Sequence, residues 1–191
     1  MAHLTILGTG NMASAIASVA EKGGHTVQVL GRSDTDRDVT GDLVVLAVPY
    51  PAVSEILDQR ANQLVGKVVV DITNPLDFET FDSLTVPADG SATAEIAAAL
   101  PDSTVLKAFN TTFAGTLAAG TVGPLPTTVL IAGDDVDAKA LLAGIVTDGG
   151  LRAIDAGGLS RARELESLGF LQITLAADEK VSWTGGLGVV A

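Results

Sequence analysis

His3-Leu-Thr-Ile-Leu-Gly8-Thr9-Gly10-Asn11-Met12-Ala13 is the stretch of sequence that decides the fold. The apolar run 4–7 predicts a short buried strand, and the pattern that follows places Ala13, Ile16, Ala17 and Ala20 on one face of a helix. Between them stands G-x-G-x-x-A, in the strand–turn–helix context of a dinucleotide-binding motif. We favour dinucleotide binding over the alternative, a strand–helix turn without a ligand.

Each small residue of this motif has a physical role. Gly8 permits the tight turn, and Gly10 lets backbone N–H groups approach a pyrophosphate at the helix N-terminus. Ala13 stands where a small residue lets the helix pack closely against the strand.

The second predicted strand, residues 25–30, ends in Gly31-Arg32-Ser33. A site that prefers NAD places Asp or Glu there to bind the ribose hydroxyls. Arg32 and Ser33 instead offer a charge and a hydroxyl that suit a ribose 2′-phosphate, while Asp34 and Asp36 lie beyond the strand end. We therefore predict NADP rather than NAD. The alternative is a solvated arginine in a polar loop.

Length and composition limit the class of protein. The 191 residues, 47% of them hydrophobic, suit a single domain over 1–191. No apolar run approaches the ~20 residues of a membrane span, and the chain enters its first strand at once, so we expect neither a membrane segment nor a secretory signal. The absence of cysteine excludes disulfides, and a net charge of −12 disfavours nucleic acid. We expect a cytoplasmic protein.

Strand and helix patterns alternate along the chain, as in a doubly wound, parallel Rossmann-type α/β sheet. Further strands are predicted at 42–48, 67–72, 104–109, 127–132 and 151–154, and a final helix at about 160–177. The nine residues between Arg32 and Asp42 are too few for the usual crossover helix and third strand. We therefore expect the sheet to be abbreviated after its second strand.

The predicted strands end in residues that suit a ligand, because a ligand binds outside the carboxyl ends of the strands in such sheets. These ends include Val48-Pro49, Asn74 and Asn110. Each asparagine amide suits a ribose or a carboxamide, and an ordinary role in a turn is equally consistent with the sequence.

Acid–base and metal chemistry find little support in the sequence. His3 and His25 are the two histidines, and both begin strands at the end opposite the ligand edge. The acidic clusters 134–137 and 164–166 fit a solvated helix face or helix-dipole placement better than a metal site. We predict no metal and no identifiable catalytic side chain. Hydride transfer between two cofactors needs positioning more than a protein acid or base.

Together the motifs resemble the NADPH-dependent reductases of the deazaflavin coenzyme F420 over nearly the whole chain. The matching segments are ILGTGNMA, GRS, VVLAVP, GKVVVDITNP, VLKAFNT, IAGDD and DAGGLSRARELESL. The resemblance implies a small Rossmann domain with a C-terminal helical extension at about 158–191, often a homodimer. It also implies hydride exchange between NADP(H) and the deazaflavin.

Carried over by position, the resemblance assigns site residues. Thr9, Gly10, Asn11 and Met12 would line the pyrophosphate turn. Arg32 and Ser33 would hold the 2′-phosphate, and Asn74 and Asn110 would lie near the nicotinamide. The segment after Ser33 is shorter than is typical of the family.

Two alternatives stay open. One is an NADPH-dependent flavin or ferric reductase, and another is a non-catalytic NADP-binding redox sensor. A β-hydroxyacid or imine reductase would need a large helical second domain, which the C-terminal segment is too short to supply.

Trp183 is interpreted as a packing residue rather than a wall of the acceptor pocket. The final helix, with Phe170, is interpreted as a dimer contact.

Overall fold

The strand–turn–helix unit at the start of the chain is present as expected. In the computed structural model, which describes residues 1–190, β1 (His3–Leu7) leads through residues 8–10 into α1 (Asn11–Lys22). The four residues predicted for the inner face of α1 are all buried. Because the strand and the helix are both covered by the core, the turn between them is held at the edge of the sheet.

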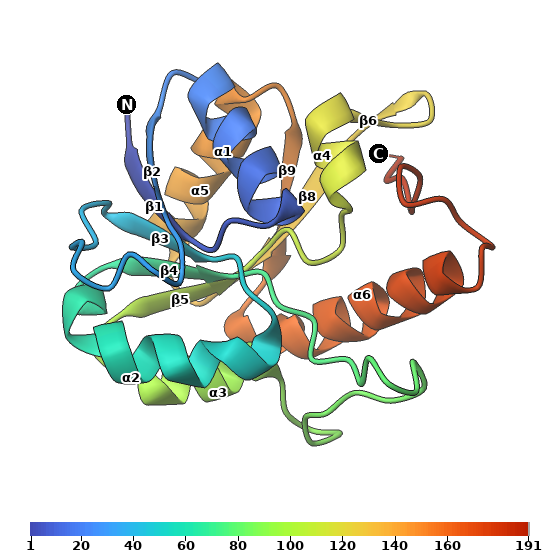
Figure 1. Cartoon of the computed structure of the whole chain (residues 1–191). Helices are drawn as coiled ribbons and strands as arrows, with labels where there is room; N and C mark the ends of the chain where they lie inside the picture. Colours follow the sequence, from blue (N-terminus) through green and yellow to red (C-terminus); the bar gives the residue numbers. More distant parts are fainter. Residues whose placement is uncertain (191) are drawn as a thin grey trace.

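The main sheet has seven strands in the order β2-β1-β3-β4-β5-β8-β9 (Figure 1). Its other strands are β2 (Thr26–Leu30), β3 (Leu43–Leu46), β4 (Val68–Asp71), β5 (Thr104–Lys107), β8 (Thr128–Ala132) and β9 (Arg152–Gly157). β2 forms the edge beside β1, and residues 31–42 contain no strand. The expected loss of the third strand is confirmed.

One feature of the sheet differs from the fully parallel arrangement that we expected. β8 runs antiparallel to β5 and meets it at a single pair, Lys107 with Ala132, whereas β8 and β9 are parallel to each other. Between β5 and β8 lie α4 (Ala114–Ala119) and a two-stranded hairpin, β6 (Thr121–Val122) with β7 (Leu125–Pro126). These elements are too short to show a periodic pattern, so the sequence analysis missed them and the reversal that they allow.

Helices cover both faces of the sheet (Figure 1). α1 and α5 (Val136–Asp148) lie on one face, while α2 (Val53–Leu64) and α3 (Ala92–Ala99) lie on the other. Short 3₁₀ turns, η1 (Tyr50–Ala52) and η2 (Leu159–Arg161), precede α2 and α6 (Ala162–Ala177). α6 extends past the sheet towards the C-terminal segment, beside the loop that follows β4.

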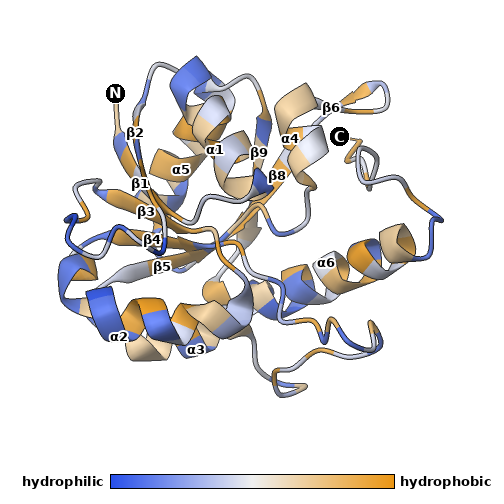
Figure 2. Cartoon of the chain, viewed as in Figure 1, coloured by the Kyte–Doolittle hydropathy of each residue, from blue (hydrophilic) through white to orange (hydrophobic). Residues whose placement is uncertain are grey.

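The distribution of hydropathy agrees with this layering. Figure 2 shows apolar residues along the central strands and hydrophilic residues on the outer side of α2. β3 is fully buried because helices cover both sides of it. No helix among residues 1–190 is both long and apolar enough to cross a membrane.

Candidate dinucleotide and hydride-acceptor site

The turn between β1 and α1 has the geometry of an anion site. Gly8 has a positive φ of 129°, and a side chain there would overlap the carbonyl oxygen of Ala47. A Cβ at Gly10 would meet no heavy atom within 4 Å. The first helical bond of α1 runs from the N–H of Ser14 to the carbonyl of Gly10 at 3.0 Å, which leaves the preceding N–H groups for a ligand. This open cradle fits a pyrophosphate.

A pocket of about 350 Å³ lies on one side of this turn. Its walls bring together most of the predicted residues of the adenosine half: Gly8, Thr9, Gly10, Arg32, Val48 and Pro49. α2 adds Glu55, Ile56, Gln59 and Arg60, which the sequence analysis did not select. The apolar floor and the charged rim suit an adenosine that carries a phosphate.

Arg32 lies at this pocket and Ser33 does not line it. The Arg32 side chain is 88% exposed and forms an ion pair with Glu55 at 3.0 Å. The Asp34 carboxylate is turned back into the chain, where it accepts the N–H of Gly31 at 2.7 Å. This hydrogen bond holds the pKa of Asp34 below its ordinary value. Asp34 is therefore part of the turn and not of the pocket wall.

Arg60 is a second guanidinium at the pocket, and it is 7% exposed. It donates to the carbonyl oxygens of Asp34 and Arg37, and so holds the abbreviated loop after β2. Among the described residues, no carboxylate lies within ion-pair distance of it. The sequence contains one indication of this role. Arg60 interrupts the apolar stripe of α2 at a position that faces the core, where a charged residue is unusual.

A second pocket, of about 490 Å³, lies on the other side of the turn. Asn11 and Met12 line it from α1, and Asn74 and Asn110 line it from the ends of β4 and β5. Its other walls are largely apolar and aromatic: Ile72, Phe78, Phe109, Phe113, Ile173 and Trp183. No described residue that lines it has an ionisable side chain.

The two asparagines hold each other in place. Asn110 Nδ2 donates to Asn74 Oδ1 at 2.9 Å and to the carbonyl of Leu165 at 2.8 Å, while Asn74 Nδ2 donates to the carbonyl of Asn110 at 3.0 Å. Asn110 is 5% exposed, and its Oδ1 has no hydrogen-bond partner among the described residues. A buried acceptor without a donor is costly, so this oxygen fits a donor such as a ligand carboxamide.

Backbone strain helps to place Asn110. Phe109 has a φ of 62° although it is not a glycine, and the N–H of Asn110 donates to the carbonyl of Ala108 at 2.8 Å. Such a tight, left-handed turn costs energy and persists only where its surroundings enforce it. Here Phe109 is buried in the core, and the turn directs Asn110 to the second pocket.

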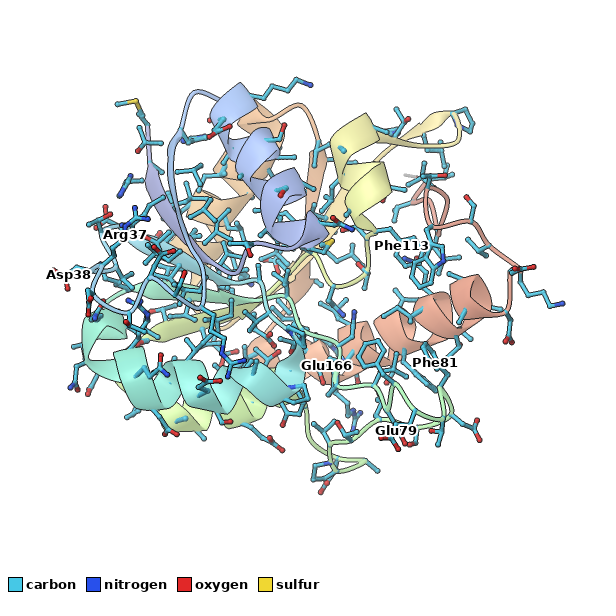
Figure 3. All side chains as sticks on the ribbon, viewed as in Figure 1. Arg37, Asp38, Glu79, Phe81, Phe113 and Glu166 are labelled. Atoms are coloured by element: carbon cyan, nitrogen blue, oxygen red, sulfur yellow. The ribbon has the colours of Figure 1, made fainter. Side chains whose placement is uncertain are left out.

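Trp183 packs, as predicted, but it also forms a wall of the second pocket, which the prediction had disfavoured. Its side chain is 54% exposed, lines the second pocket and lies against Phe113 with ring centroids 5.1 Å apart. Figure 3 shows Phe113 at the start of α4, facing the C-terminal segment. Trp183 therefore packs on one side of its ring while the remainder faces the pocket.

Glu166 was expected on a solvated helix face, and this expectation is wrong. Its side chain is fully buried between α6 and the sheet (Figure 3). Lys107 Nζ lies 2.9 Å from Glu166 Oε1 and 2.8 Å from Asp71 Oδ2. The hydroxyl of Thr93 donates to Asp71, and the N–H groups of Ala92 and Thr93 donate to Glu166. This buried cluster ties α6 to α3 and to the ends of β4 and β5.

The histidines lie where they were predicted, at the opposite end of the sheet. His25 Nε2 is 3.2 Å from Asp148 Oδ2, and the ring of His3 bridges the hydroxyls of Thr26 and Thr40. Neither histidine lines either of the two pockets.

Comparisons with known proteins agree with this geometry. Residues 35–75 match the family model described as NADP oxidoreductase coenzyme F420-dependent. The F420-dependent NADP reductase of Methanocaldococcus jannaschii is 30% identical over 171 residues, which cover 87% of this chain and 76% of that protein. The enzyme of the same name from Methanothermobacter marburgensis is 31% identical over 179 residues, 91% of this chain and 79% of that protein.

A solved structure from Arthrobacter sp. FB24 shares the fold. It superposes with a TM-score of 0.85 and covers 98% of this chain and 99% of its own, at 24% sequence identity. The Rossmann-type sheet with its C-terminal helix is thus common to both. Given this fold and the extent of the sequence match to both methanogen enzymes, the chain belongs to the family of F420-dependent NADP reductases.

Proposed function

We propose that this oxidoreductase transfers a hydride between NADP(H) and coenzyme F420 without a protein acid or base. The observation that carries the proposal is the second pocket, which adjoins the dinucleotide turn through Asn11 and Met12 and has no ionisable side chain on its described walls. Hydride transfer between two ring systems requires alignment and exclusion of water, and the largely apolar and aromatic walls of this pocket suit both requirements.

The residues divide the task between the two pockets. The free N–H groups at the start of α1 would bind the pyrophosphate, and Arg32 would bind the 2′-phosphate. Asn110 Oδ1, which has no partner, would accept a hydrogen bond from the nicotinamide carboxamide, with Asn74 holding its amide in place. Ser33 adjoins Arg32 but does not line the pocket, so its contact with the 2′-phosphate stays a prediction.

With both bound, the site would support hydride transfer between the nicotinamide C4 and the deazaflavin C5, with one proton taken up from solvent when F420 is reduced and released to it in the reverse direction. The chain's part is to keep the two rings face to face. Phe113 and Trp183 would form an aromatic wall on one side, and Ile173 on α6 would cover another. These apolar groups would keep bulk water away from the transferred hydride.

The test compares acceptors. The purified protein is mixed with NADPH and, in separate reactions, with oxidised F420, FMN, FAD or riboflavin, and NADPH oxidation is followed. We expect turnover with F420 to exceed turnover with every flavin. Faster reduction of a flavin would identify the alternative flavin or ferric reductase. Stoichiometric NADPH binding without turnover of any acceptor would identify the redox sensor.

We further propose a single domain over residues 1–191, a homodimer, and a cytoplasmic location. The shared sheet supports the first proposal. For the dimer, the support is α6, which extends past the sheet and carries the exposed Leu171 beside the half-buried Phe170. Gly169, the neighbour of Phe170 in the sequence, is buried against Asn110 and so does not belong to this surface. For the location, the support is the proposed use of NADP(H), a pool that cells keep internally.

A further inference from the structure

Glu55 is the one acidic residue among the described residues that line the first pocket, the one of about 350 Å³ beside the β1–α1 turn. It lies in the first turn of α2, and its side chain is 46% exposed. Its two carboxylate oxygens lie 3.0 and 3.2 Å from the same nitrogen of Arg32. Gln59 Nε2 also donates a longer hydrogen bond, of 3.4 Å, to Glu55 Oε1. The guanidinium expected to bind a 2′-phosphate is therefore already engaged by a carboxylate of the same pocket.

This ion pair has little value for stability. The Arg32 side chain is 88% exposed, and pairs so accessible to water contribute little because solvent screens them. Among the described residues, Arg32 has no hydrogen-bond partner apart from Glu55. The pair therefore adds little to the fold, and its consequence lies in the ligand that the pocket admits, because both residues line that pocket.

We propose that Glu55 determines the cofactor preference of this site by competing with the 2′-phosphate for Arg32. The proposal rests on the proposed function, because it requires the adenosine end of NADP(H) to occupy this pocket. A 2′-phosphate must displace the Glu55 carboxylate and then lie near a like charge. A plain ribose leaves the ion pair intact and offers hydroxyl donors that a carboxylate accepts, as acidic residues do in NAD sites.

The consequence is a site whose preference for NADP over NAD is reduced by its own acidic residue. Arg60 stays in place in either case, because carbonyl oxygens of the loop hold its guanidinium. Its positive charge favours the phosphate whether or not Glu55 is displaced. Glu55 and Arg60 therefore act in opposite directions on the same ligand group.

The test uses ligand fragments that differ by this one group. Binding of 2′,5′-ADP and of 5′-AMP is titrated calorimetrically into the wild type and into Glu55→Gln. We expect Glu55→Gln to bind 2′,5′-ADP about three- to tenfold more tightly, with binding of 5′-AMP unchanged or weaker. The gain should shrink in 1 M salt, where the Debye length is only ~3 Å.

Two controls make the result specific. Asp58→Asn removes an equal charge from the exposed side of α2, away from the pocket lining, and should give no comparable gain. In the Arg32→Ala background, Glu55→Gln should keep only the part of its gain that comes from removing the like charge, because no Arg32 is left for which Glu55 and the phosphate compete.

Each failure has a different meaning. If the wild type prefers 2′,5′-ADP to 5′-AMP but Glu55→Gln does not change this preference, or if Asp58→Asn gives the same gain, the role of Glu55 is refuted and the cofactor site stands. If the wild type binds neither fragment, the assignment of the pocket is wrong, and both this proposal and the proposed cofactor site are refuted.

Discussion

Gly169 lies at the point where α6 meets the asparagine pair, and Gly169→Ala tests whether that contact positions the second pocket, where the nicotinamide and F420 would meet. A methyl group at this position would overlap Asn74 Oδ1 and stand 3.0 Å from both Asn110 Nδ2 and the Asn110 carbonyl oxygen. The helix or the asparagines must therefore move. The gain in helix propensity on replacing glycine by alanine opposes this cost.

The magnitudes can be compared term by term. Overpacking in a closely packed contact costs about 1–3 kcal/mol. Loss of the Asn110–Asn74 hydrogen bond costs about 1 kcal/mol, and the propensity gain of about 1 kcal/mol offsets it. We expect Gly169→Ala to lower the free energy of unfolding by about 1–3 kcal/mol. Gly144→Ala in α5 is the matched control, since its methyl group meets no heavy atom within 4 Å, and it should stabilise by about 1 kcal/mol.

Urea unfolding measures the stabilities, and steady-state kinetics measures the function. In Gly169→Ala we expect a higher KM for F420 and a lower kcat, with unchanged binding of 2′,5′-ADP, because the adenosine pocket lies on the other side of the turn. Stabilisation equal to that of Gly144→Ala, together with unchanged kinetics, would refute the reasoning.

Four further outcomes are expected. Arg32→Ala should weaken NADPH binding by about 1–3 kcal/mol and leave NADH binding nearly unchanged, and equal losses in paired titrations would contradict the 2′-phosphate contact. Gly10→Val should fold, since its side chain enters open space, but should lose NADPH binding; a thermal melt with an NADPH titration checks both. Phe170→Glu should convert a dimer into a monomer by sedimentation without changing NADPH affinity, and a monomeric wild type would exclude the dimer contact. Lys107→Met should lower stability by about 3–5 kcal/mol in urea unfolding, because it leaves buried carboxylates without their cation, and a loss below 1 kcal/mol would contradict that assignment.

Local patterns predicted the β1–turn–α1 unit and several residues of the pocket beside it. The β1–turn–α1 unit is contiguous in sequence, so the periodicity around Gly8 and Gly10 was sufficient to identify it. The convergence of Asn74 and Asn110 followed from strand direction, because carboxyl ends of parallel strands share an edge. The missing third strand followed from chain length alone.

The remaining features depend on contacts between distant residues. Arg60 and Glu55 enter the pocket because α2 packs beside the turn, and no local pattern specifies that packing. Glu166 resembles its solvated neighbour Glu164 in sequence, yet it is buried because Lys107 lies opposite it. The antiparallel direction of β8 likewise depends on the segment between β5 and β8. The helix and strands in that segment are too short to show a hydrophobic periodicity in the sequence.

One face of α6 explains how the wall of the second pocket is held in place. Glu166, Gly169 and Ile173 are three and four residues apart, so they lie along the same side of the helix. Glu166 binds the buried lysine, Gly169 packs on the asparagine pair, and Ile173 lines the second pocket. A buried ion pair is weak support for stability, but its geometry is specific. The cluster therefore sets the rotation of α6, and that rotation places both the glycine contact and the pocket wall. Any substitution that rotates α6 should disturb the second pocket, where the nicotinamide and F420 would meet, before it disturbs the adenosine pocket, which no residue of α6 lines.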